Sequence, residues 1–213
     1  MRGKQIVLAI VLLFATCSVT WAGKEAYKIV MSKEKEVCAA MLKIFNADRR
    51  KHGTVMFEEH KEFIQWEPVE VKPEPPVKYC RQLLQANFDI NNDGTDDLVI
   101  RTRHCFKGLL MDSLYVYPLE SPVPEVLEAP QIQPLGALDF RLYILRKGPM
   151  NQKGEPKAWI GWGALVLEAF KKGEKSYIIL SDYRQEWIAI AQYLDENNLD
   201  DMCYFHKKGL PAN

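Results

Sequence analysis

The stretch DINNDGTDDLVI, residues 89–100, carries oxygen-bearing side chains at alternate positions, then a glycine, further carboxylates and an apolar run. Calcium is a hard cation that binds about six to eight oxygens from carboxylates, amide carbonyls and backbone carbonyls. A tightly curled loop presents alternate side chains to its interior, so the pattern predicts one structural calcium ion. The predicted ligands are Asp89, Asn91, Asp93, the backbone carbonyl of Thr95, and Asp97.

The alternative is a turn that binds nothing, because Asn, Asp and Gly are common in turns that need left-handed backbone angles. Gly94 permits the sharp bend in either case. The ion is favoured because Asp89, Asp93 and Asp97 would otherwise repel one another within one short loop. An EF-hand is excluded, since Ile100 stands at the twelfth position, where that motif requires a bidentate glutamate.

The pattern FDINNDGTDDLVI resembles the calcium loops of FG-GAP and VCBS repeats, in which D-x-N/D-x-D-G-x-x-D-L links two strands. The resemblance covers about 20 of the 213 residues and implies the same five ligands. Those families repeat the motif, whereas this chain carries it once, so the resemblance implies the loop and its strands and not a complete propeller. The chain as a whole also looks like small exported bacterial proteins.

The N-terminus predicts a signal peptide over residues 1–22. Arg2 and Lys4 form a positive head, the apolar run IVLAIVLLFA follows, and Thr20 and Ala22 are small residues suited to a peptidase. We therefore expect cleavage after Ala22 and a periplasmic or secreted protein. The apolar run is too short for a comfortable membrane span.

Cys17 leaves a second interpretation of this segment open. A lipoprotein signal also ends in a cysteine, and a lipid anchor there would hold the chain on a membrane. Phe14 and Thr16 fit the box before such a cysteine poorly, so cleavage after Ala22 is preferred.

The cysteines that remain after cleavage are even in number, which in an exported chain predicts two disulfides. Cys80 and Cys105 flank the acidic loop at similar distances and would lie level at the open end of a hairpin. Elimination then pairs Cys38 with Cys203, which would constrain the unfolded chain by about 4 kcal/mol. Free buried thiols are the alternative.

Apolar periodicity predicts a single domain over residues 23–213, of the α+β class and mainly β. Helical spacing with a Ser32 cap indicates a helix over about residues 33–46, and EPVEVKPEPPVK at 67–78 indicates an extended connection. We expect a curved antiparallel sheet of about seven or eight strands against this helix. The expected strands are 81–90, 97–104, 114–117, 140–145, 159–170, 176–180, 187–194 and 202–205.

Two further groups of side chains have possible binding roles. Arg101, Arg103 and Lys107 could line one face of the sheet and bind an anion, although a solvated face is the simpler interpretation. Trp159 and Trp162 alternate with glycines in WIGWG and could form a ligand platform, or pack in the core.

The composition and the absence of known motifs exclude some classes of function but do not identify an activity. Balanced charge, with 28 basic and 28 acidic residues, argues against a nucleic-acid partner. The sequence contains no G-x-S-x-G, H-E-x-x-H, phosphate-loop or C-x-x-C motif. We expect a non-catalytic envelope or periplasmic protein, stabilised by calcium and disulfides, that binds a protein or glycan. A hydrolase acting on an envelope polymer and a lipid-anchored envelope protein remain alternatives.

Overall fold

The computed structural model describes residues 26–70, 82–106, 109–122, 136–138, 165–182, 184–195 and 198–208. The predicted signal peptide lies outside these residues, as do Cys80, Trp159, Trp162, the expected strand 140–145 and most of the proline-rich connection. Lys107 lies outside them too.

The described residues form one α-helix, a short 3-10 turn and ten strands, most of them antiparallel. The helix is α2 (Lys35–His52) and the turn is η1 (Phe57–Glu59). The strands are β1 (Tyr27–Ser32), β2 (Glu67–Pro68), β3 (Gln82–Phe88), β4 (Asp97–Phe106), β5 (Leu109–Pro118), β6 (Gly136–Leu138), β7 (Leu165–Lys172), β8 (Lys175–Asp182), β9 (Trp187–Asp195) and β10 (Asn198–Lys207).

Two antiparallel sheets organise these strands. The five-stranded sheet has the order β1-β10-β9-β8-β7, and the four-stranded sheet has the order β5-β4-β3-β2, with β6 added on β5. Among the described residues, the sheets join at one parallel residue pair, Met111 with Leu165. The predicted class, mainly β with an N-terminal helix, is confirmed; the strand count is higher because β1, β2 and β6 were not expected.

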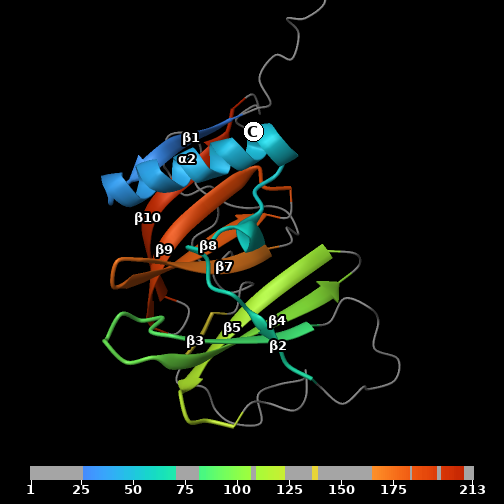
Figure 1. Cartoon of the computed structure of the whole chain (residues 1–213), viewed down its shortest axis with the longest axis vertical. Helices are drawn as coiled ribbons and strands as arrows, with labels where there is room; N and C mark the ends of the chain where they lie inside the picture. Colours follow the sequence, from blue (N-terminus) through green and yellow to red (C-terminus); the bar gives the residue numbers. More distant parts are fainter. Residues whose placement is uncertain are drawn as a thin grey trace, which may run out of the picture.

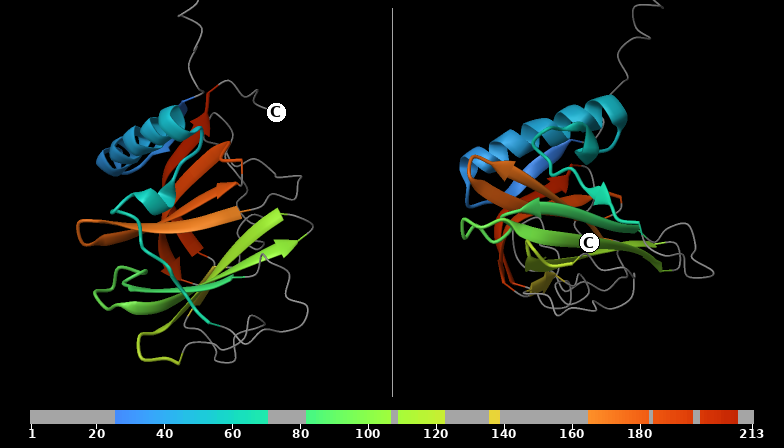
Figure 2. Two further views of the ribbon diagram at one scale, coloured as in Figure 1. Left: turned by 45° about the vertical axis from the view of Figure 1, so that its right-hand side comes forward. Right: turned by 60° about the horizontal axis from the view of Figure 1, so that its bottom comes forward.

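The three layers are the helix, the five-stranded sheet and the four-stranded sheet (Figures 1 and 2). Strand β8 shows why both sides of the middle layer are apolar. Ile178 and Leu180 face the core between the two sheets, whereas Tyr177 and Ile179 face the core beneath α2. Its continuous apolar run is typical of a strand that is covered on both faces.

The helix differs from its predicted bounds of 33–46 at both ends. It begins at Lys35 without a side-chain cap, because Ser32 ends β1 instead, where it pairs with Cys203. It continues to His52 and stops at Gly53, whose φ of 82° favours glycine. The basic last turn suits the negative end of the helix dipole, and the apolar stripe on which the prediction rested does not extend that far.

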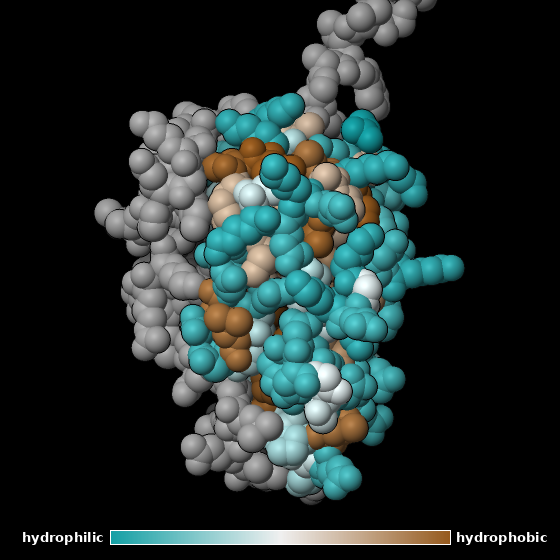
Figure 3. All heavy atoms as spheres, turned by 90° about the vertical axis from the view of Figure 1, so that its left-hand side faces the viewer, coloured by the Kyte–Doolittle hydropathy of each residue, from teal (hydrophilic) through white to brown (hydrophobic). Residues whose placement is uncertain are grey.

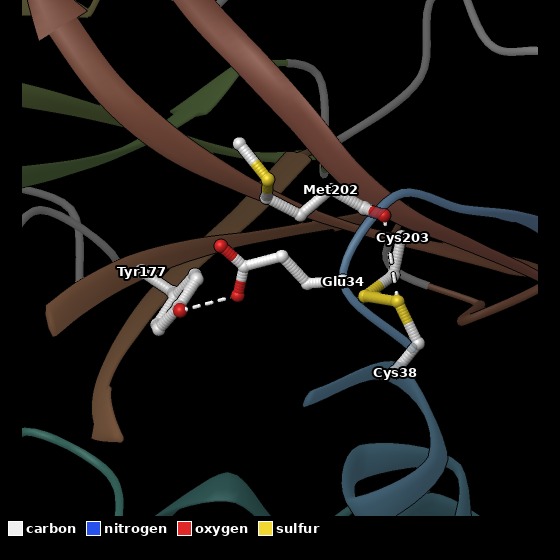
Figure 4. Close-up of a disulfide and its surroundings, with 5 residues drawn as sticks. All are labelled: Glu34, Cys38, Tyr177, Met202 and Cys203. Atoms are coloured by element: carbon white, nitrogen blue, oxygen red, sulfur yellow. Dashed lines mark hydrogen bonds between the residues drawn. A yellow bond between two sulfur atoms is a disulfide. The ribbon is translucent and has the colours of Figure 1, made fainter. Parts of the chain in front are cut away.

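The predicted disulfide between Cys38 and Cys203 is present and ties α2 to β10 (Figure 4). It joins residues 165 positions apart. Beside it, the Glu34 carboxylate accepts a 2.6 Å hydrogen bond from the Tyr177 hydroxyl. The pairing of Cys80 with Cys105 stays a prediction, because Cys80 lies outside the described residues.

Among the described residues, no helix combines the length and the apolar character that a membrane span requires.

Candidate functional site

The predicted calcium loop connects β3 to β4, as the sequence indicated. The two strands form a regular antiparallel hairpin from Gln82 opposite Arg103 to Phe88 opposite Asp97. Residues 89–96 therefore span the closed end of a hairpin, with Asp97 as the first residue of the return strand.

The loop curls around the side chains predicted as ligands. Asp89 accepts hydrogen bonds from the backbone N–H of Asp93 at 3.0 Å and of Gly94 at 2.8 Å. Asp93 accepts one from the backbone N–H of Thr95 at 2.8 Å, and the Asn91 amide donates to Asp93 at 2.8 Å. The positive φ of 91° at Gly94 completes the bend. The side chains of Asp89, Asn91 and Asp93 are thus hydrogen-bonded within the loop, and their role as ligands stays a prediction.

Asp97 stands at the base of the loop and is only 6% exposed. Its carboxylate accepts a hydrogen bond from the Ile90 backbone N–H at 3.3 Å. Burial, together with the neighbouring charges of Asp93, Asp89 and Asp96, raises the pKa of Asp97 to about 6. Negative charge is therefore concentrated at this end of the hairpin.

The donor set suits calcium chemically, because it consists of carboxylate and amide oxygens with a backbone carbonyl. Within the part of the chain that the structure describes, no three His, Cys, Asp or Glu side chains converge as a metal site. Asp89 and Asp93 instead accept hydrogen bonds from the loop's own backbone. An ionised carboxylate has about four lone-pair sites, so these backbone bonds leave sites that a cation can use.

The residues between the predicted ligands attach the loop to the other sheet. Ile90 is fully buried in the core between the sheets. Asn92 accepts a 2.6 Å bond from the Ser176 N–H and donates a 3.2 Å bond to its carbonyl. Asp96 lies 3.9 Å from Lys171. The tips of the β3–β4 and β7–β8 hairpins therefore lie side by side (Figures 1 and 2), on a mainly hydrophilic face (Figure 3).

A second concentration of charge lies inside the molecule, where β4, β5 and β7 meet. We call it the buried ion cluster; it consists of Arg101, Arg103, Asp112 and Glu168. Arg101 is 1% exposed and contacts Asp112 at 2.5 Å and Glu168 at 2.8 Å. Arg103 contacts Asp112 at 3.0 Å. Two positive and two negative groups thus neutralise one another.

Trp66 covers the buried ion cluster from the segment that leads into β2. Its indole N–H donates to Glu168 at 3.1 Å, and its ring lies 5.5 Å from the Arg101 guanidinium carbon. Asp112 also accepts a 3.1 Å bond from the Leu167 backbone N–H. Burial raises the pKa of Glu168, and the Arg101 charge opposes that rise. These contacts connect the two sheets close to Met111 and Leu165, the one backbone pair between β5 and β7 among the described residues.

The interpretation of Arg101 as part of a solvated or anion-binding face is therefore wrong. Strand alternation correctly placed Arg101 and Arg103 on the same face as Val99, but that face is covered by the second sheet. A signal for this was present in the sequence. Asp112 and Glu168 are isolated carboxylates within the apolar stretches LLMDSLY and LVLEAF, where an unpaired charge would be costly.

Three comparisons, with family models, with curated proteins and with solved structures, found no match to the chain.

Proposed function

We propose that this chain is an exported, non-catalytic protein of the cell envelope or periplasm that binds a protein or glycan partner. In this proposal one calcium ion in the loop at residues 89–97 and disulfide bonds stabilise the fold. The predicted ligands are Asp89, Asn91, Asp93, Asp97 and the Thr95 carbonyl.

The observation that carries the calcium proposal is that alternate residues of the loop make different contacts. Asp89, Asn91 and Asp93 are hydrogen-bonded within the loop, while Ile90 and Asn92 attach it to the second sheet. Because these contacts hold the backbone of the loop from outside, its acidic side chains stay at the same end of the hairpin although they repel one another. A bound cation would offset that repulsion, so the geometry favours a stabilising role for the ion.

The disulfide supports export. Bonds of this kind persist in oxidising compartments and are rare in the cytosol. Cys38 and Cys203 belong to the first helix and the last strand, so this crosslink encloses most of the described fold.

Thermal unfolding in 1 mM calcium and in excess chelator tests the proposal. A ligand at about 100 times its Kd stabilises a folded protein by about 2.7 kcal/mol, so calcium should raise the melting temperature by several degrees. Magnesium at the same concentration controls for ionic strength. Asp93→Asn should abolish the calcium effect, whereas Asp195→Asn, an exposed carboxylate outside the loop, should retain it. Equal melting temperatures in calcium and chelator would refute the ion.

Mass spectrometry of the N-terminus tests the export route. The proposal expects a chain that begins at Gly23. A diacylglycerol-modified Cys17 would instead establish the lipid-anchored alternative.

A further inference from the structure

The outer side of the four-stranded sheet carries an open groove of about 510 Å³. It lies where β3 and the start of β4 meet the segment that enters β2 and the residues that follow β5. The described residues that line it are Ile64, Gln65, Glu67, Gln85, Ala86, Asn87, Leu98, Leu119 and Ser121. Volumes of about 300–1,000 Å³ are usual for small-ligand sites.

The groove exists because one segment changes its strand partner. The Ile64 N–H donates to the Ala169 carbonyl at 2.8 Å, so the chain there runs beside β7. Three residues later Glu67 pairs with Gln85 on β3. Between these points the chain has left β7 and is not yet paired with β3, and the groove lies there, beside Ala86 and Asn87.

The wall of the groove is polar and uncharged except for one carboxylate. Gln65, Gln85 and Asn87 offer amide groups that both donate and accept hydrogen bonds, and Glu67 offers a carboxylate. No lysine, arginine or histidine is among the described lining residues. An anionic ligand would therefore have no cation to pair with, and a neutral ligand with several hydroxyl or amide groups fits better.

The floor supplies apolar contact. Leu98 belongs to the buried cluster on the outer face of this sheet, whereas Leu119 is 45% exposed. An exposed leucine beside a row of amides matches a ligand that has C–H surface on one side and polar groups on the other. Sugar rings have this distribution.

Gln85 provides a separate observation, because its side-chain oxygen lacks a hydrogen-bond donor in the part of the chain that the structure describes. Its Oε1 atom is buried and has no hydrogen-bond partner among the described residues. Gln85 also lines the groove, so a ligand N–H or O–H that reached this carbonyl oxygen would supply the hydrogen bond that the described residues do not.

We propose that this groove binds a short neutral oligosaccharide, with hydroxyl or acetamido groups on the amides and C–H surface against Leu119. The assignment rests on the partner-binding part of the proposed function and is independent of the calcium ion. An extended peptide fits less well. Segment 67–69 already pairs with Leu83, Leu84 and Gln85, so only a short length of the β3 edge is left for a peptide backbone.

The test uses the chain from Gly23 onward, which retains every described residue. Chitotetraose and maltotetraose are titrated separately while the side-chain amide signals of Gln65 and Asn87 are followed by NMR. We expect one of the two sugars to shift both signals, and the preferred sugar tells whether the acetamido group matters. Asn87→Ala should weaken binding at least tenfold. Asn198→Ala, an exposed amide elsewhere, should change it less than twofold.

Binding is measured in calcium and in chelator, so the two proposals fail separately. Sugar binding without any calcium effect on melting would refute the ion and keep the groove. No shift with either sugar at millimolar concentration, or equal effects of Asn87→Ala and Asn198→Ala, would overturn the groove assignment. Shifts caused by a mixture of hexapeptides and by neither sugar would also overturn it, in favour of a peptide partner.

Discussion

Strand β4 contributes to two groups of charged residues that differ in how their charge is balanced. At its first residue, Asp97 joins the acidic loop, where charges of one sign gather near the surface. Four residues later, Arg101 lies in the buried ion cluster, where both signs occur and the charges sum to zero. A buried charge must be compensated by the chain itself, because desolvation is costly. A loop at the surface can leave its charge to be compensated by a solute.

The largest expected effect is on the buried ion cluster. Arg101→Met leaves Asp112 and Glu168 buried without their shared cation, and should lower the free energy of unfolding by about 3–5 kcal/mol. Urea denaturation measures the loss. Arg103→Met, at the more exposed edge of the cluster, is the control and should cost clearly less. A loss below about 1 kcal/mol for Arg101→Met would show that the cluster does not fasten the sheets.

A substitution in the acidic loop should change the melting temperature in opposite directions in chelator and in calcium. Asp97→Asn removes a buried charge that its acidic neighbours destabilise and keeps an oxygen to accept the Ile90 N–H, so in chelator it should raise the melting temperature; in calcium it removes a predicted ligand and should lower it, by about 2–4 °C each way. Scanning calorimetry in both buffers makes the comparison. Arg101→Met should lower the melting temperature equally in both buffers, because the charges of the buried ion cluster are balanced by one another and not by a solute. A loop variant that shifts alike in both buffers would contradict the distinction.

A smaller effect is expected where the loop meets the second sheet. Asn92→Ala deletes both hydrogen bonds to the Ser176 backbone and should cost about 1–2 kcal/mol in urea denaturation. Asp96→Ala is the matched control. It removes the exposed contact with Lys171 and one of the like charges near Asp97, and should change the free energy of unfolding by about 0.5 kcal/mol or less. Equal losses would mean that the loop does not dock through Asn92.

The smallest expected effect is on how the free energy of unfolding changes with pH. Burial raises the folded-state pKa of Glu168 above its ordinary value of 4.5. Unfolding releases this carboxyl to ionise in water, so its contribution to stability falls as pH rises from about 4.5 through the folded-state pKa. Glu168→Gln should therefore flatten the decline measured by urea denaturation in chelator across that window. Asn198→Ala, on an exposed residue without a titratable side chain, is the control and should leave the slope unchanged.

The sequence predicted the local features well and the contacts between distant segments poorly. The loop, its two strands and the β7–β8 hairpin follow from neighbouring residues, such as Gly173 with its φ of 64° in the turn. The disulfide between Cys38 and Cys203 followed by elimination, from the even number of cysteines and the proposed pairing of the other two. The buried ion cluster did not, because Arg101, Asp112 and Glu168 come from separate strands. Which strands adjoin depends on sheet order, and spacing along the chain does not encode it.

The groove was missed for a related reason. It depends on the point at which one segment leaves β7 and joins β3, and two different ladders fix that point. In the sequence, Gln65 and Glu67 are ordinary polar residues before a proline-rich stretch. Their relation to Asn87 appears only when both ladders are present.

The crosslink between α2 and β10 has a mechanical consequence. β1 lies outside the covalent ring that it closes and pairs with β10 from Ser32 opposite Cys203 to Tyr27 opposite Lys207. Tension that pulled residues 27 and 207 apart would therefore open these pairs one after another, as in a zipper. The load would then pass to the sulfur–sulfur bond, and the sheets, the acidic loop and the groove within the ring would be shielded from it.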